Sequence, residues 1–457
     1  MSQSLANGAH LEFVLIFFAI CMNVLTTSYA QKGFLSIIDC GSNRTHYKDN
    51  LGLTWVTDNG TYMKTGISVE QSYADFTLLN ASAGAGNQAF HSYRYFPERL
   101  NKYCYELETV PNASFLIRAS FYLNEFELQK RLPFQFVTYI NATEWFTVTV
   151  GEGSQSEMFV AQEAIFYAPG ALTYFCMVPV IGVPFISSLE LRQLEPTMYA
   201  YSGSRLQFLS LLFRYNLEPY TTAPEVVRFP DDLYDRVWTS LASEDQIGTF
   251  SNSTQASNTT GPDVNYVPPK VMQGAWLFSE NNKQTSFMFW FDIYTAPQVS
   301  LTELHYAYTV AYAESLDSTS SLPFSMDILL DYDYDARIGL GAFDATINVS
   351  NQASMQVTPN LLLVSPGIEI QLSLPSAQEG SLTSTPLNAF EAYGQFDYKF
   401  STKYSSDAAT MTILQSNLSR TDWQGDPCTP VPYEGISCTC STCGPVYGAQ
   451  SPLCEKK

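Results

Sequence analysis

The feature that most constrains the fold of this chain is a recurring pattern of short segments rich in aromatic and β-branched residues. Such segments occur at residues 115–123, 134–140, 145–150 and 324–330, and clusters of Gly, Asn or Pro separate them. Residues of these types suit the pleated surface of a strand, whose side chains alternate between two faces. Long apolar stripes with the helical period of 3.6 residues are largely missing. The pattern predicts an all-β protein, most simply a pair of β-sandwiches.

The composition favours a folded chain and excludes some partners. Hydrophobic residues make up 46% and charged residues only 15%, so the chain can bury large cores rather than remain disordered. The formal net charge of −21 repels phosphate groups, which argues against nucleic acid, anionic membrane faces and long polyanions as partners. The same charge is also compatible with a simple solubility role. A chain of 457 residues is longer than a single hydrophobic core usually supports, so two domains and a tail are expected.

Residues 1–30 have the pattern of a signal peptide. An apolar run covers residues 11–25, and the small residues Ser28 and Ala30 occupy the two positions that a signal peptidase recognises before its cleavage site. We expect cleavage after Ala30 and a secreted or extracellular location. Since the segment has no Lys or Arg, an uncleaved signal anchor remains a second interpretation. The uncharged stretch at residues 164–189 is interrupted by Pro and Gly, so it predicts two buried strands and a turn rather than a membrane span.

Acceptor sites for N-linked glycans occur along the whole chain and support passage through the secretory pathway. Their number exceeds what chance gives, and none has Pro in the middle position, so they indicate surface loops that accept glycans. The acceptor residues are Asn43, Asn59, Asn80, Asn112, Asn141, Asn252, Asn258, Asn348 and Asn417.

The cysteines point to the same compartment. Of the 9 Cys, Cys21 leaves with the signal peptide and an even number remains. In an oxidising compartment such a set indicates disulfide bonds, although the sequence alone does not choose their pairing. The cluster Cys438, Cys440 and Cys443 could also bind zinc. A structural zinc site needs four ligands and the tail offers no His, so disulfides are favoured and no metal is expected.

Few residues suggest catalysis. Outside the signal peptide the histidines are widely separated and lie in no metalloprotease or triad motif, namely His46, His91 and His305. The paired carboxylates that a glycosidase would need are Asp231 with Asp232, or the run Asp331, Asp333 and Asp335. That run could also hold calcium, but it lacks the Gly and Glu of an EF-hand loop, so a solvent-exposed hairpin tip is favoured. We expect no enzyme activity and no cofactor.

Motifs near both ends of the chain identify a family resemblance. The first comprises residues 33–41 (GFLSIIDCG) and 47–55 (YKDNLGLTW), and the second comprises residues 422–428 (DWQGDPC) with Cys438. Together they resemble the malectin-like ectodomain of plant receptor-like kinases, in which the second motif introduces leucine-rich repeats. Residues 229–238 (FPDDLYDRVW) resemble the segment that opens the second malectin module. No leucine-rich repeat motif follows Cys438, and the sequence contains no kinase motif. We therefore expect any signalling to pass through a partner.

The resemblance implies a domain organisation and two disulfide pairs. We expect two tandem malectin-like β-sandwich (jelly-roll-like) domains followed by a short Cys-rich tail. The expected ranges are 1–30 for the signal peptide, 31–205 and 206–400 for the two domains, and 401–457 for the linker and tail. The resemblance pairs Cys428 with Cys438, and more weakly Cys40 with Cys104.

Candidate ligand-binding residues come from an aromatic cluster at residues 91–105 and its expected neighbours. Sugar sites combine flat aromatic rings with carboxylates that accept two hydroxyls at once. By the resemblance, Tyr122 corresponds to the aromatic position that malectin uses against glucose. Aromatic residues at this density also fill cores, so a purely structural role stays open. The predicted ligand-binding residues are Asp58, Tyr62, Tyr93, Tyr95 and Tyr122.

These observations lead to three hypotheses for function. The first is a non-enzymatic extracellular protein that binds a cell-wall glycan, an oligosaccharide or another ligand in cell-surface or cell-wall sensing. The second is a protein-interaction ectodomain, a decoy or co-receptor with no sugar site, which modulates a full-length receptor through a receptor or peptide partner. The third is a glycoside-active enzyme. We predict the first, keep the second as the alternative because a fold does not fix a ligand, and disfavour the third.

Overall fold

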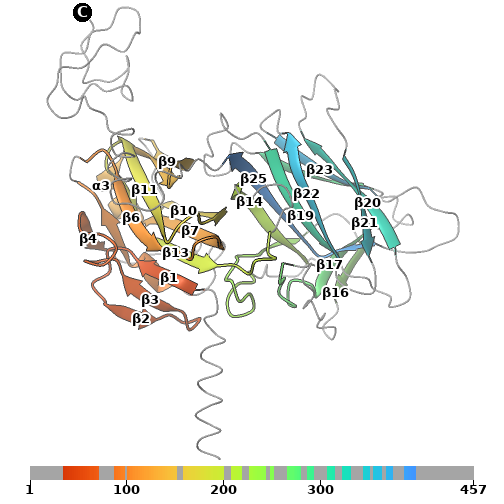
Figure 1. Cartoon of the computed structure of the whole chain (residues 1–457), viewed down its shortest axis with the longest axis horizontal. Coiled ribbons are helices and arrows are strands. Elements are labelled where there is room, and N and C mark those ends of the chain that lie inside the picture. The colour runs from red at the N-terminus through yellow and green to blue at the C-terminus, as the bar shows by residue number, and fades with distance from the viewer. Residues whose placement is uncertain are drawn as a thin grey trace, which may run out of the picture.

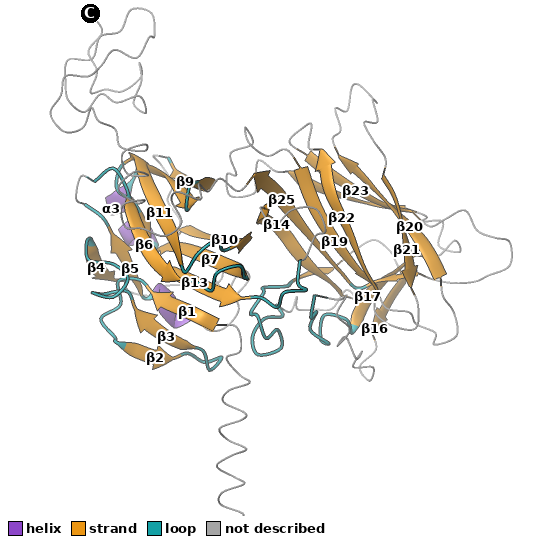
Figure 2. Cartoon of the chain, in the orientation of Figure 1, coloured by secondary structure: helices purple, strands orange, loops and turns teal. Residues whose placement is uncertain are grey.

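The described part of the chain is mostly β-strand in a computed structural model, and the all-β prediction is confirmed (Figures 1 and 2). Within the described residues the only helices are the short α3 (Glu125–Arg131) and the 3-10 turn η1 (Asn87–Phe90). No described helix has the length and apolar character needed to cross a bilayer. The structure describes residues 34–71, 87–97, 100–151, 158–199, 207–218, 226–242, 248–251, 265–278, 286–292, 306–313, 322–330, 343–349, 354–362, 367–373 and 385–397.

One 11-stranded sheet runs through both halves of the molecule. We call β1 to β13 the first module and β14 to β25 the second module. The modules join where β10 and β14 pair antiparallel, from Ala164↔Ser210 to Phe166↔Phe208. The sheet order is β2 (His46–Lys48), β3 (Thr54–Thr57), β1 (Phe34–Asp39), β13 (Ser188–Gln193), β7 (Ser114–Leu123), β10 (Met158–Tyr167), β14 (Gln207–Glu218), β25 (Ala389–Asp397), β19 (Tyr306–Ala313) and β22 (Ser354–Leu362), with β15 (Thr239–Ala242) beside β14.

A second sheet completes the sandwich of the first module. Phe121 on β7 contacts Phe136 and Phe146 across the core, with ring centroids 5.5 Å and 5.8 Å apart. Alternating buried and half-buried residues along β8 show the period of two expected for a strand with one face on this core. The opposing sheet contains β6 (Tyr103–Glu108), β11 (Leu172–Ile181), β8 (Phe134–Ile140) and β9 (Thr143–Val150), and a small sheet contains β12 (Phe185–Ile186), β5 (Ser92–Tyr95) and β4 (Ile67–Glu70).

The second module repeats this plan with its own sheets beside β14, β25, β19 and β22 (Figure 1). Both additional sheets are antiparallel throughout. One contains β18 (Ser286–Asp292), β23 (Gly367–Ser373), β20 (Leu322–Leu330) and β21 (Phe343–Val349), and the other contains β16 (Gly248–Ser251), β17 (Gly274–Phe278) and β24 (Thr385–Leu387).

The strand predictions agree with the structure within a few residues. The four predicted segments correspond to β7, β8, β9 and β20. The uncharged stretch at residues 164–189 forms parts of strands rather than a membrane span, and it includes all of β11. The domain limits at 205 and 400 stay a prediction, and the tail at 401–457 lies outside the described residues.

Candidate functional site

Asp58, a predicted ligand-binding residue, is fully buried and its carboxylate is already hydrogen-bonded. Arg94 donates from Nε to Oδ2 at 2.6 Å and from Nη2 to Oδ1 at 2.7 Å. The hydroxyl of Tyr105 donates to Oδ2 at 2.8 Å, and the backbone N–H of Gly41 donates to Oδ1 at 3.0 Å. A carboxylate offers about four acceptor positions, so these bonds leave none for the hydroxyls of a sugar.

Tyr93 and Tyr95 lie on β5 on either side of Arg94 in the sequence, and they contact groups other than Asp58. Tyr93 is fully buried, and its hydroxyl donates to Glu127 Oε2 at 2.5 Å and accepts from Arg131 Nη2 at 2.9 Å. Burial, together with the bond to Glu127, raises the pKa of Tyr93 well above its usual range. Tyr95 is half-buried, and the Arg131 guanidinium lies 3.7 Å from its ring centroid. This cation–π contact covers one face of the ring.

The remaining predicted residues, Tyr62 and Tyr122, also belong to packed regions. Tyr62 is half-buried against the core of the first module. Tyr122 is buried on β7 and makes an edge contact with Phe90 at 6.0 Å, and Phe90 makes a similar contact with Phe159 at 5.4 Å. The structure therefore does not gather the five predicted residues into an open site. Direct ligand contact by Asp58, Tyr93 and Tyr122 conflicts with their burial.

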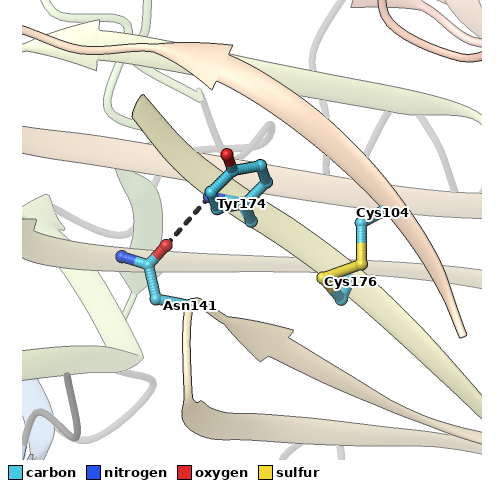
Figure 3. The surroundings of a disulfide bond; sticks show 4 residues. All are labelled: Cys104, Asn141, Tyr174 and Cys176. Carbon is cyan, nitrogen blue, oxygen red and sulfur yellow. Dashed lines mark hydrogen bonds between the residues drawn. A yellow bond between two sulfur atoms is a disulfide. The ribbon is translucent and has the colours of Figure 1, made fainter. Parts of the chain in front are cut away.

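The structure corrects one predicted disulfide pair. Cys104 bonds to Cys176, and Cys40 is a free, buried cysteine, so the expected bond between Cys40 and Cys104 is wrong (Figure 3). The reason is register: Cys104 on β6 lies directly opposite Cys176 on β11 with their Cα atoms 4.0 Å apart, whereas Cys40 follows β1 in the other sheet. Burial raises the pKa of the Cys40 thiol well above its usual range. The predicted Cys428–Cys438 pair lies outside the described residues.

The glycan acceptors that the structure describes lie mainly at the surface. Asn43, Asn59 and Asn112 are exposed, as a glycan requires. Asn141 is half-buried, and its Oδ1 accepts from the backbone N–H of Tyr174 at 3.0 Å (Figure 3). Asn348 lies in β21, where its side chain is outside the described set, and the other acceptors lie outside it altogether, namely Asn80, Asn252, Asn258 and Asn417.

The carboxylates considered for glycosidase chemistry do not form a described pair facing a ligand. Asp232 is buried and accepts from Arg236 Nε and Trp238 Nε1, each at 2.8 Å. Its neighbour Asp231 points to solvent, where it pairs with Lys270 at 3.3 Å. The run at residues 331–335 and His305 lie outside the described residues. Among those described, no three His, Cys, Asp or Glu residues group as metal ligands.

Asp235 lies at the junction of the two modules and joins them electrostatically. It is fully buried, and its backbone φ is 52°, a left-handed conformation that residues other than Gly seldom adopt. Its carboxylate accepts from Arg118 at 2.9 Å, from Arg192 at 2.6 Å and from Arg228 at 2.8 Å. Arg118 and Arg192 lie on β7 and β13 of the first module, so the 229–238 segment is held to that module by ion pairs.

Glu163 on β10 forms a second ionic centre at this junction. Its Oε1 accepts from Arg118 Nη2 at 2.5 Å and its Oε2 accepts from Arg214 Nη1 at 2.8 Å. Burial alone would raise the pKa of the Glu163 carboxyl, but Arg214 and Arg118 lower it to about 2. Arg214 belongs to β14, so this pair crosses from the first module to the second. Both partners stay ionised at neutral pH.

A cavity of about 280 Å³ lies next to these ion pairs, where β10 and β14 separate. Pairing between the two strands stops at Ala164↔Ser210, and the pairing of β14 with β25 is irregular just beyond this point, between Leu211 and Phe213. The amide of Gln162 spans the gap and donates to the backbone oxygen of Leu211 at 2.6 Å. The aromatic residues that line the cavity are Trp55, Phe90, Phe159, Phe213 and Tyr215, and the charged ones are Arg118, Glu163, Glu190, Arg214 and Arg228.

Sequence reasoning missed this cavity, although one signal for it was present. Arg118, Glu163 and Arg214 each lie among apolar residues of a strand, and charged residues are seldom buried unless they are paired. Such residues on several strands indicate a buried ionic network. Which strands meet could not be read from the sequence, because pairing between β10 and β14 joins residues far apart in the chain.

The fold places this chain among the malectin-like proteins. The malectin-like domain family matches residues 38–395, and the chain belongs to this family. The extracellular domain of ANXUR1 from Arabidopsis thaliana has the same fold, with a TM-score of 0.58 at 14% identity over 79% of this chain and 96% of that one.

Similar curated proteins are receptor kinases of Arabidopsis thaliana. The probable LRR receptor-like serine/threonine-protein kinase At1g67720 is 28% identical over 420 residues, which is 88% of this chain and 41% of the kinase. A second such kinase, At4g20450, is 26% identical over 458 residues, or 96% of this chain and 47% of the kinase. The chain thus spans less than half the length of these relatives.

Proposed function

We propose that this chain is a non-enzymatic extracellular binding protein that takes a sugar unit of a cell-wall glycan into the junction cavity. The observation that carries the proposal is the cavity itself, in which aromatic rings meet buried polar and charged groups. Rings such as Phe159 and Tyr215 suit the apolar C–H faces of a sugar. The side-chain oxygen of Gln162 suits a sugar hydroxyl, because the amide nitrogen already donates to Ser210 and Leu211. The volume of about 280 Å³ lies at the small end of ligand pockets and suits a ligand of one or two rings.

The test is titration of the purified chain with a panel of cell-wall oligosaccharides, followed by calorimetry. Substitution Phe159→Ala removes a half-buried ring of the cavity, and we expect it to weaken binding by ~10-fold or more. Phe126→Ala is the matched control, because Phe126 is 65% exposed on α3 and does not line the cavity. Binding that is absent across the panel, or equal in both variants, would contradict the proposal.

A second candidate function is recognition of a peptide or co-receptor. It is favoured by the solved complex of the plant peptide RALF23 with FER and LLG2, one chain of which has the fold of this protein with a TM-score of 0.56 at 12% identity. Under this alternative the chain would modulate a receptor without a sugar site. Co-precipitation with a receptor ectodomain that is unchanged by Phe159→Ala, together with no glycan binding, would support it.

The extracellular location is part of the same proposal. It is supported by the signal-peptide pattern and by the exposed acceptors Asn43, Asn59 and Asn112. Expression in plant cells should give a product in the medium or at the cell surface that begins after Ala30 and loses mass on treatment with an N-glycosidase. A cytosolic product with no glycan would count against it.

A further inference from the structure

The charged groups that line the junction cavity are already paired within the chain. Arg118 donates from Nε to Glu163 at 2.8 Å and from Nη1 to Asp235 at 2.9 Å. Arg228 donates from Nε and Nη2 to the two oxygens of Asp235, each at 2.8 Å. Arg214 donates from Nη1 to Glu163 at 2.8 Å, and its Nε lies 3.6 Å from Glu391. Each guanidinium that lines the cavity therefore has a carboxylate partner within the chain.

This pairing sets a condition on the ligand. Removing one partner of a buried guanidinium–carboxylate pair is strongly destabilising, so an incoming carboxylate could bind Arg118 or Arg214 only by displacing one of their carboxylate partners, such as the shared Glu163. The displaced Glu163 would then remain buried without its counter-ions, since it is 5% exposed. The overall charge of −21 acts in the same direction, because it repels an anion before it reaches the cavity. A neutral sugar ring neither has to displace a carboxylate nor is repelled by the overall charge.

We propose that the junction cavity selects neutral sugar units and rejects uronic acids. The inference rests on the proposed function, and it goes further by naming the ligand class of the same site. Neutral sugars can pack against the rings of Phe90 and Phe159 and donate a hydroxyl hydrogen bond to Oε1 of Gln162 without disturbing the ion pairs. The preference for neutral sugars thus arises because the guanidinium groups of the cavity are already paired with carboxylates of the same chain.

The experiment uses pairs of oligosaccharides of equal length that differ only at C6, with CH₂OH in one member and a carboxylate in the other. Suitable pairs are glucan with glucuronan, mannan with mannuronan and galactan with galacturonan. Calorimetry at neutral pH measures the affinity of the intact chain for both members of each pair. For the backbone that binds, we expect the neutral member to bind at least ~10-fold more tightly.

The variant Glu163→Gln tests the reason for the selectivity. It keeps the size of the side chain but removes its charge, so Arg118 and Arg214 lose their shared partner and should attract a uronate. We expect the preference for the neutral member to shrink by ~10-fold or to reverse. Glu106→Gln is the control, because it removes the same charge from an exposed position on β6 away from the cavity. If Glu163→Gln does not fold, Glu190→Gln tests the same idea at another carboxylate of the cavity wall.

The outcomes separate this inference from the proposed function. If the wild-type chain prefers the uronate member and Phe159→Ala abolishes that binding, the selectivity is overturned while a sugar-binding cavity stands. If Glu163→Gln and Glu106→Gln shift the preference equally, the local ion pairs are not its cause and the inference is overturned. If no member of any pair binds in a manner sensitive to Phe159→Ala, both the inference and the proposed function are overturned.

Discussion

Asp39 illustrates how burial changes the chemistry of one carboxyl group. It lies at the end of β1, and it is only 2% exposed. Ser92 donates to its Oδ1 at 2.7 Å and Tyr47 donates to its Oδ2 at 2.9 Å. Burial nevertheless outweighs these bonds and raises the pKa of Asp39 to about 7. Near neutral pH a large fraction of the folded chain therefore holds a proton at this position.

This shift predicts a pH dependence of stability. The folded pKa of about 7 exceeds the ordinary value of 3.8, so the folded state binds the proton more tightly and loses stability as the pH rises from about 4 to 7. The loss can reach roughly 4 kcal/mol. We expect Asp39→Asn to flatten this part of the profile, as measured by urea unfolding at several pH values. Asp231→Asn, at an exposed position, should leave the slope unchanged. If the Asp39→Asn variant keeps the wild-type slope of stability against pH, the slope does not come from Asp39.

The predicted ligand residues show why side-chain chemistry alone did not locate a site. Asp58 and Tyr93 have the residue types of a sugar site, but in the structure they bond to Arg94 and Glu127 in a buried hydrogen-bond network. The difference lies in direction: on β5 the burial pattern runs from buried Ser92 to half-buried Tyr95, so most of the strand faces packed neighbours. Direction depends on which element covers each face, and a single sequence does not state it.

At the scale of elements, the pairing of β6 with β11 fixes the disulfide. Cys104 and Cys176 are opposite one another in the ladder and 72 residues apart in the chain. A bond across a segment of this length restricts the unfolded chain, so its loss should lower the free energy of unfolding by about 2–4 kcal/mol. The register of two strands thus decided a pairing that cysteine spacing left open.

The corresponding prediction uses the double variant Cys104→Ala with Cys176→Ala. We expect the stated loss of stability in denaturant unfolding, and peptide mapping of the wild-type protein should recover a fragment that links the two cysteines. Cys40→Ala serves as the control, because Cys40 is free and its removal leaves the linked fragment intact. A linked fragment containing Cys40 and Cys104 would restore the original sequence-based pairing.

At the scale of the whole molecule, the junction unites the modules through a shared sheet and a shared ionic network. The sheet connection between β10 and β14 covers few residues, from Ala164↔Ser210 to Phe166↔Phe208. Asp235 adds ion pairs to Arg118 and Arg192 of the first module. Because these contacts are buried, we expect the modules to unfold together rather than one after the other.

Asp235→Asn tests this coupling. The change leaves several buried guanidinium groups short of their counter-ion, and we expect a loss of about 3–5 kcal/mol together with separation of the thermal transition into two steps. Differential scanning calorimetry measures both effects. Asp231→Asn, close in sequence but exposed, should keep one transition and near-wild-type stability. A single unshifted transition in Asp235→Asn would show that the shared sheet is sufficient to join the modules.

Much of the fold followed from the sequence, but little of the site did. Segments such as 134–140 predict strands because their alternating apolar residues must bury one face, and β8 has those bounds. The 229–238 segment was identified as a landmark of the family, yet its role as a buried ionic link between modules was not. Arg118, Glu163 and Arg214 come from three different strands, so their meeting depends on sheet order rather than on local pattern.

The sequence by itself determined the fold class, several of the strands and the family resemblance, because strand periodicity and short motifs are local properties of the chain. Tertiary structure alone decided which cysteines bond, which carboxylates are buried and where a cavity opens. These outcomes depend on contacts between residues far apart in the chain, such as Glu163 with Arg214 and Arg118 with Asp235. Only the folded sheet brings those charges close enough to neutralise one another.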